Sequence, residues 1–141
     1  MIIESDVFKL LSTNKELITL LESYRKGPFD KKYPTGIFVF DIPETPVNLK
    51  KTELAPMIRI NPTYDNESYF SDDVSIASEQ RVKIEFWCKT IKQSEEVAKV
   101  IDKILKENGY ARYTANENPR YKDTDIDLIM NIRKYRYFLW E

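Results

Sequence analysis

The segment RVKIEFWCKTIKQSEEVAKVIDKILKENGY, residues 81–110, constrains the fold most, because it reads as a strand that runs directly into a helix. Every second side chain in its first part is apolar: Val82, Ile84, Phe86 and Cys88. This period of two is typical of a strand with one face in the core. Apolar residues then recur every three or four positions from Val97 to Leu105, which predicts an amphipathic helix. Ser94 is its expected N-cap, and Gly109 ends it.

Two more helices are expected near the start of the chain, and strands fill most of the remainder. Ser5 and Asp6 are candidate N-caps for a helix that contains VFKLL, and a second helix spans residues 14–27. Stretches rich in β-branched and aromatic residues predict strands at 36–42, 54–64, 110–115 and 126–140. Pro62 is expected to end its strand or confine it to an edge. The last stretch is long, so a bend or bulge is expected in it.

This order of elements predicts an α+β fold. Because the strands come mostly in runs, we expect a mostly antiparallel sheet of about four or five strands with helices packed on one face. A chain of 141 residues has the length of about one domain. We therefore expect a single domain over residues 1–141, with a protruding acidic loop or hairpin at about 61–80.

Composition argues against catalysis. The chain has no histidine and only three glycines. Histidine-dependent triads, Cys/His zinc sites and histidine proton shuttles are therefore excluded, and phosphate-binding loops have few places to form. The single cysteine, Cys88, alternates with core residues, so we interpret it as a buried side chain and not as a reactive thiol. We expect a protein that is not an enzyme and that binds no cofactor.

Charge and hydropathy limit the partners. The 22 basic and 23 acidic side chains produce no overall positive field of the kind that attracts nucleic acid. The longest apolar run, Ile37 to Phe40, is far shorter than the ~20 residues that span a bilayer, and the first residues lack a secretory signal pattern. We expect a cytoplasmic protein without a membrane partner and without specific nucleic-acid binding.

Two carboxylate patterns are candidate metal sites, and each lacks a residue that such a site needs. Asp123, Asp125 and Asp127 alternate in KDTDIDL, but the glycine and glutamate that a calcium loop needs are replaced by Leu128 and Lys134. Metal-dependent nucleases often have a lysine two residues after the metal-binding acid, and after Glu85 that place holds Trp87. We therefore predict no metal site.

Residues 61–80 are acidic and lack any basic residue, whereas the chain after Gly109 is rich in arginine and lysine interleaved with tyrosine. The acidic stretch is a binding loop, a disordered segment or an extended hairpin that turns near Asp65 and Asn66. The aromatic and basic run RKYRYFLW is interpreted as an amphipathic strand, with single-stranded nucleic-acid stacking as the alternative. Trp87 lies on the outward face of its predicted strand, where contact with another protein would explain an apolar side chain.

The chain resembles the small tail-terminator and head-to-tail joining proteins of long-tailed bacteriophages, including minor tail proteins of phages that infect low-GC Gram-positive bacteria. The likeness follows the chain in order: VFKLLSTNKELITLL, GIFVFDIPE, APMIRI, VKIEFWCKT, SEEVAKVIDKILKENGY and DTDIDLIMNIRKYRY. These are packing patterns that cover nearly the whole chain. None of them is a reactive motif.

The resemblance implies a structural virion protein without a cofactor. Such subunits assemble head to tail into a ring, typically a hexamer, which caps the tail tube and joins the tail to the head. The implied partners are further copies of the chain, the major tail tube protein and the head-connector or neck proteins. The implied location is the cytoplasm of an infected or lysogenic bacterial host and then the virion tail.

For the contact between subunits, we expect the acidic arm of one copy to lie against the basic strands of the next. The candidate interface residues are Tyr69, Phe70, Asp72, Asp73, Trp87, Arg112, Arg133 and Arg136. An intracellular adaptor or another neck protein is the alternative function. A nucleic-acid-binding protein or an enzyme fits the composition less well.

Overall fold

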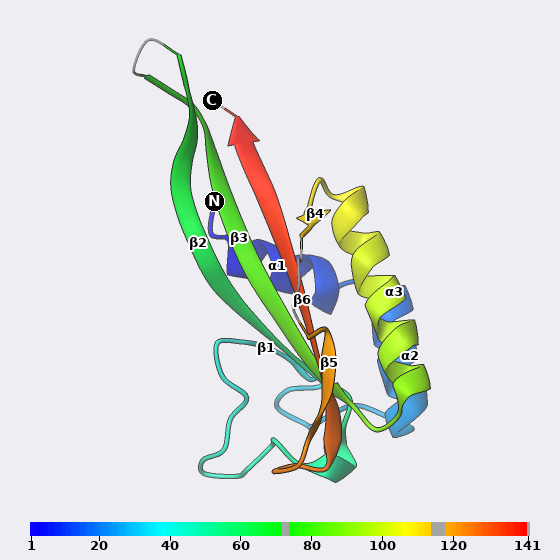
Figure 1. The fold of residues 1–141 in the computed structure, drawn as a ribbon. Helices are drawn as coiled ribbons and strands as arrows, with labels where there is room; N and C mark the ends of the chain where they lie inside the picture. The colour runs from blue at the N-terminus through cyan, green and yellow to red at the C-terminus, as the bar shows by residue number, and fades with distance from the viewer. Residues whose placement is uncertain (72–73, 114–117, 141) are drawn as a thin grey trace.

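The computed structural model describes residues 1–71, 74–113 and 118–140, and in this part three α-helices cover one face of a six-stranded sheet (Figure 1). The helices are α1 (Ile3–Ser12), α2 (Lys15–Arg25) and α3 (Ile91–Glu107), and a short 3-10 helix spans Thr52–Leu54. The strands are β1 (Ile37–Val39), β2 (Met57–Ser71), β3 (Val74–Cys88), β4 (Ala111–Arg112), β5 (Arg120–Asp123) and β6 (Leu128–Trp140). The predicted α+β class is confirmed, and β5 is the strand that was not expected.

The sheet is mostly antiparallel, as predicted. Its order is β1-β2-β3-β6-β4, and β5 also pairs with β6. Only the short β1 runs parallel to its neighbour among the described strands, pairing Ile37 with Ile58 and Val39 with Ile60. The three long strands β2, β3 and β6 therefore form the centre of the fold; β1 and β5 flank their lower halves, and β4 pairs higher on β6.

Helix ends depend on side chains that accept backbone hydrogen bonds. Asn14 caps α2, because its Oδ1 accepts a hydrogen bond from the Leu17 N–H at 3.0 Å. The expected cap of α3 was wrong: Thr90 caps the helix through the Gln93 N–H at 3.1 Å, while Ser94 is buried one turn inside it. The first helix begins at Ile3, before the expected caps Ser5 and Asp6. No helix in the described chain combines the length and apolar character needed to cross a membrane.

The sheet is apolar on both faces, and each face has its own core. The helix-facing core contains Ile58, Ile84, Phe86 and Cys88 from the strands, packed against Leu17, Leu21, Ile101 and Leu105 from the helices. The second core lies on the opposite face under residues 28–56, and its members include Phe38, Met57, Trp87 and Met130. Arg25 joins these parts, because its guanidinium donates hydrogen bonds to the carbonyls of Thr35 and Pro56.

The strands β2 and β3 continue well beyond the positions that the sequence suggested. Pro62 does not end its strand. It lies opposite Val82 of β3, two residues beyond Ile60, where the ladder with β1 ends. The Ile58 N–H points to the β1 side, and by the same alternation the missing N–H of Pro62 falls on that outer edge, where no described strand would accept it. Asp65 and Asn66 lie within the ladder opposite Gln80 and Glu79, and not at a turn. A bend or bulge was expected in β6, but β6 pairs with β3 without a register shift from Ile129 to Trp140. The register shifts lie in the ladder between β2 and β3.

Candidate subunit interface

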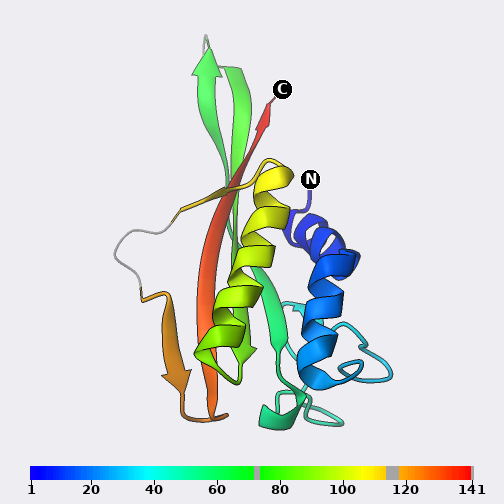
Figure 2. The same cartoon turned by 90° about the vertical axis from the view of Figure 1, so that its right-hand side faces the viewer.

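A hairpin of β2 and β3 projects beyond the helix layer, and the end of β6 lies beside it (Figure 2). The ladder of β1 on β2 ends at Ile60, so the outer edge of β2 has no partner strand among the described residues after that point. On the other side, β4 pairs with β6 only at Tyr135 and Arg136. The projecting part therefore has two sheet edges that lack a partner strand among the described residues, and such edges can pair with another chain.

The hairpin carries the acidic residues that the sequence indicated, but only some of their carboxylates are exposed to a partner. Asp65 and Glu67 are exposed on β2. Glu79 is 7% exposed and accepts a hydrogen bond from Arg81 of its own strand. The predicted residues Asp72 and Asp73 lie outside the described residues, as do the side chains of Tyr69 and Phe70, whose backbone pairs with Ala77 and Ser75.

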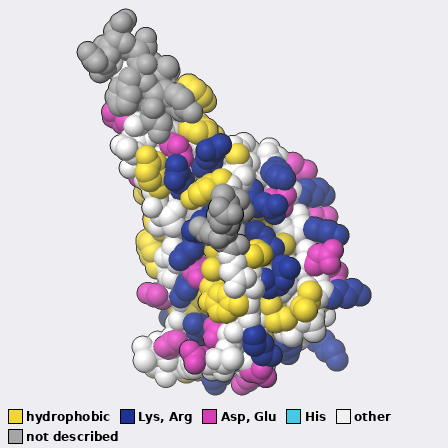
Figure 3. Space-filling model, in the orientation of Figure 1, with side chains coloured by type: hydrophobic (Ala, Val, Ile, Leu, Met, Phe, Trp, Pro, Cys, Tyr) yellow, Lys and Arg dark blue, Asp and Glu magenta, His cyan; other side chains and the backbone are white. Residues whose placement is uncertain are grey.

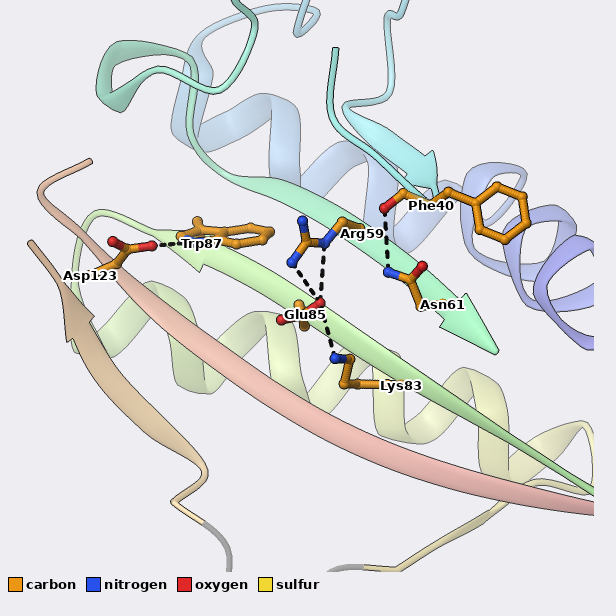
Figure 4. Close-up of polar contacts among 7 residues, drawn as sticks. All are labelled: Phe40, Arg59, Asn61, Lys83, Glu85, Trp87 and Asp123. Carbon is orange, nitrogen blue, oxygen red and sulfur yellow. Dashed lines mark hydrogen bonds and ion pairs between the residues drawn. The ribbon is translucent and has the colours of Figure 1, made fainter. Parts of the chain in front are cut away.

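Basic side chains gather on the sheet face opposite the helices. In the antiparallel register Arg81 lies opposite Arg136, and Lys83 lies opposite Lys134. Like charges directly opposite each other repel, so this arrangement favours acidic neighbours. Glu85 supplies one: its Oε1 accepts hydrogen bonds from Arg59 Nε at 3.1 Å and Nη2 at 2.9 Å, and Lys83 Nζ lies at 3.7 Å (Figure 4).

Arg81 also organises the aromatic side chains at the base of the hairpin. Its guanidinium carbon lies 4.3 Å from the centre of the Tyr64 ring and 5.1 Å from that of Tyr113. Both distances are within the range of cation–π attraction. The root of the hairpin is thus held by the same residue that neutralises Glu79.

Trp87 belongs to the second core and not to an open surface. It is 1% exposed, because residues 28–56 of the same chain cover it. Its Nε1 donates a hydrogen bond to Asp123 Oδ2 at 3.0 Å (Figure 4). Lys50 Nζ lies 4.8 Å from the ring centre. The intermolecular contact expected at Trp87 is therefore replaced by an intramolecular one, and we leave this residue out of the proposed interface.

The three predicted arginines do not share one surface. Arg136 is exposed on the face that carries Arg81, with its guanidinium 5.5 Å from the ring centre of Phe138. Arg112 and Arg133 are on the helix side, where Arg112 pairs with Asp102 of α3 at 3.8 Å and Arg133 lies over Phe86. The basic region that reads as continuous in the sequence is split between the two faces, because neighbouring residues of a strand point in opposite directions.

Sequence reasoning missed Phe40 as a surface residue. It follows β1 directly and has φ of 71°, a left-handed conformation that is rare for an aromatic residue. Its N–H donates to Ile60 O at 3.0 Å and its carbonyl accepts from Asn61 Nδ2 at 3.3 Å, which turns a 51% exposed ring away from the strand (Figure 4). No residue pattern signals this turn, because Phe40 continues an apolar run.

The candidate reactive thiol is buried, and two of the candidate metal-binding aspartates have partners within the fold. Cys88 is fully buried, as predicted, and burial raises the pKa of its thiol to about 12. Asp123 accepts the Trp87 hydrogen bond, and Asp127 forms an ion pair with Lys122 at 2.8 Å. Within the described ranges, no three acidic or sulfur side chains lie close enough to hold a metal ion.

Comparisons with known proteins give a likeness of fold. No protein-family model and no curated protein matches the chain. Among solved structures, the gp17 protein of bacteriophage SPP1 is similar, with a TM-score of 0.51 and 10% sequence identity. The likeness covers 96% of this chain and 86% of that one, so it extends over almost the entire fold.

Proposed function

We propose that this protein is a structural component of a bacteriophage tail, and that it acts as a tail terminator. In this role copies of the chain form a ring, which we take to be a hexamer, that caps the tail tube and joins it to the head connector. The proposal is supported by the sequence resemblance to tail-terminator proteins and by the fold shared with a bacteriophage protein. The role requires stable surfaces and no turnover, so we propose no catalytic activity.

The observation that carries the proposal is the projecting hairpin, whose outer β2 edge and neighbouring β6 end both lack a partner strand among the described residues. A closed ring of identical subunits needs a heterologous interface, in which two unlike surfaces of one subunit meet. The outer edge of β2 and the end of β6 are two such surfaces on opposite sides of the same sheet. We propose that the outer edge of β2 in one subunit lies against the end of β6 in the next subunit.

Charge favours the same arrangement. Asp65 and Glu67 are exposed at the β2 edge, and Arg136 is exposed on β6. Opposite charges on meeting surfaces accelerate association and fix the register, while apolar side chains provide most of the burial. Leu139 and Trp140, which are 37% and 64% exposed at the end of β6, are candidates for that burial.

A shortened hairpin tests the proposal. Because Tyr64 pairs with Arg81, residues 65–80 are replaced by Asn-Gly, which suits a two-residue hairpin turn between these partners. We expect the unaltered protein to form rings, by itself or on purified tail tubes, and the shortened protein to remain monomeric. Light scattering measures the mass, and electron microscopy shows the rings.

A charge variant covers the case in which the shortened chain folds poorly. Asp65→Lys combined with Glu67→Lys leaves the hairpin intact and reverses its charge, so association weakens while the unfolding temperature stays close to that of the unaltered protein. Lys31→Glu combined with Lys51→Glu, in the exposed loops of residues 28–56, is the matched control. Rings of full size in both hairpin variants exclude the hairpin as the interface, and an unaltered protein that stays monomeric on tail tubes excludes the ring.

A further inference from the structure

A pocket on the helix side of the sheet gathers three arginines that the proposed ring does not use. The cavity has a volume of about 230 Å³ and lies between α3 and the strands β4, β5 and β6. Arg112, Arg120 and Arg133 come from these three strands, and Ile91, Glu95, Ala98, Lys99 and Asp102 of α3 complete the lining. Figure 3 shows basic side chains spread over the middle of the molecule, with acidic ones between them.

The acidic side chains of the lining already have cationic partners. Glu95 pairs with Lys99 at 3.2 Å, and Asp102 pairs with Lys106 at 2.8 Å. Asp102 also accepts a hydrogen bond from the Tyr135 hydroxyl at 3.0 Å. Burial alone would raise the pKa of Asp102, but the bonds from Lys106 and Tyr135 outweigh it and hold the pKa below its usual value.

Two of the arginines that line the pocket lack a carboxylate ion-pair partner among the described residues. In the described part of the chain, no ion pair joins a carboxylate to Arg120 or Arg133. Arg133 is half-buried, and its Nη1 donates to the carbonyls of Pro119 and Ile132 at 3.1 and 2.9 Å. Burial lowers the pKa of Arg133, and the nearby charges of Arg112 and Arg120 lower it further, while Tyr135 and Asp102 act in the opposite direction without outweighing them. The pocket therefore holds positive charges that repel one another.

We propose that this pocket binds an oxyanion, a phosphate or a carboxylate group, through Arg112, Arg120 and Arg133. Guanidinium groups match such anions because their planar N–H donors form paired hydrogen bonds with two oxygens. The three arginines line the same pocket from three different strands, so more than one of them can contact a bound group. Solvated surface arginines would instead bind anions weakly and without saturation. Saturable binding therefore distinguishes a specific oxyanion site from an ordinary basic surface. The site does not depend on ring formation.

Isothermal titration of the full-length protein with inorganic phosphate, and separately with glutarate, tests the site at constant pH and ionic strength. We expect one saturable site per chain for at least one of these anions. Arg120→Gln should weaken that binding at least about tenfold, because it removes a charge-assisted contact. Arg133→Gln should have a similar effect. A preference for phosphate assigns a phosphate ligand, and a preference for glutarate assigns an acidic side chain of a protein partner.

The matched control is Lys31→Gln, which removes one positive charge from an exposed loop outside the pocket. It should leave the dissociation constant unchanged. Because Arg120 is exposed and makes no ion pair with a described carboxylate, its variant is expected to unfold at the same temperature as the unaltered protein. The proposal is overturned if neither anion saturates the unaltered protein, or if Arg120→Gln and Arg133→Gln both bind as tightly as the control.

Discussion

At the scale of single residues, burial decides the chemistry of Cys88 and gives the fold a dependence on pH. The thiol faces the helix-side core and is fully buried, so its ionised form is disfavoured. Its pKa is raised from 9.0 to about 12, first by burial, although a hydrogen bond with Ser94 acts in the opposite direction. A thiol of this kind reacts slowly and stabilises the fold only as a small apolar group.

Cys88 should make the protein less stable as the pH rises above about 9. The unfolded thiol ionises near its ordinary pKa, whereas the folded thiol keeps its proton until about 12. The stability linked to a raised pKa is present below the unfolded value and is lost with increasing pH, at up to about 1.4 kcal/mol per pH unit for one group. Cys88→Ala removes this loss and leaves the tyrosines unchanged. Urea unfolding measures the free energy of unfolding at pH 8 and pH 10. Between these values the unaltered protein should lose more of that free energy than the variant does, and an equal loss in both proteins would contradict the role of Cys88.

Trp87 shows which part of a side chain's surroundings can be predicted from the sequence. Alternation along the strand placed it correctly on the face opposite Cys88. The cover over that face comes from residues 28–56, which include only the short strand β1 and one turn of 3-10 helix. Contacts of an irregular segment have no period, so no local pattern distinguishes an intramolecular cover from a binding partner.

At the scale of elements, one buried polar contact joins α3 to the sheet. Asn131 of β6 is fully buried, and its Nδ2 donates to Ser94 Oγ at 2.9 Å and to the carbonyls of Phe86 and Ile129. A buried amide that lost these partners would carry a desolvation cost. The contact therefore fixes the position of α3 over β3 and β6 more specifically than apolar packing alone.

Thr90 and Ser94 should respond differently to replacement by alanine. Thr90→Ala removes the cap of α3 and should lower the free energy of unfolding by about 1 kcal/mol. Ser94→Ala should cost about 0.5–1.5 kcal/mol through the lost hydrogen bond with Asn131. In double-mutant cycles with Asn131→Leu, Ser94 should therefore be coupled and Thr90 should be additive. Coupling of Thr90, or additivity of Ser94, would contradict these roles.

The long strands show why element types were easier to predict than element lengths. The apolar patterns identified the cores of β2, β3 and β6, but beyond Pro62 strand β2 reads Thr63 to Glu67, with a single aromatic residue and no apolar alternation to reveal it. The candidate interface followed the same rule. The sequence contains basic residues at matching intervals in the two strands. That Arg81 lies opposite Arg136, and Lys83 opposite Lys134, follows only from the register of β3 and β6.

At the scale of the whole molecule, the body contains both cores, and the proposed assembly surface lies on the projecting hairpin. The two cores lie around the lower half of the sheet, whereas in the upper half the β2 edge and the β6 end extend beyond the helices (Figure 2). Stability therefore resides mainly in the body, and the proposed assembly depends on the projection and on residues near its base. Variants at the boundary between them separate folding from association.

Phe40 lies at that boundary, and Phe40→Asn should separate the two properties. Asparagine adopts positive φ more readily than phenylalanine, so the monomer should keep its stability or gain up to about 1 kcal/mol. Association should weaken about tenfold, because an exposed aromatic side chain beside the β2 edge is lost. Chemical unfolding measures the first effect and sedimentation the second. Val47→Asn, at another exposed apolar residue, is the control, and equal association in both variants would exclude Phe40 from the interface.

In the proposed assembly, a contact between two unlike edges has no built-in stop. Each copy that joined would present the same margin again, so growth would end only where the accumulated rotation brought the last copy back to the first. The twist of the upper strands would then help to set the number of copies, and a slightly different twist would yield a spiral filament from an otherwise unchanged protein.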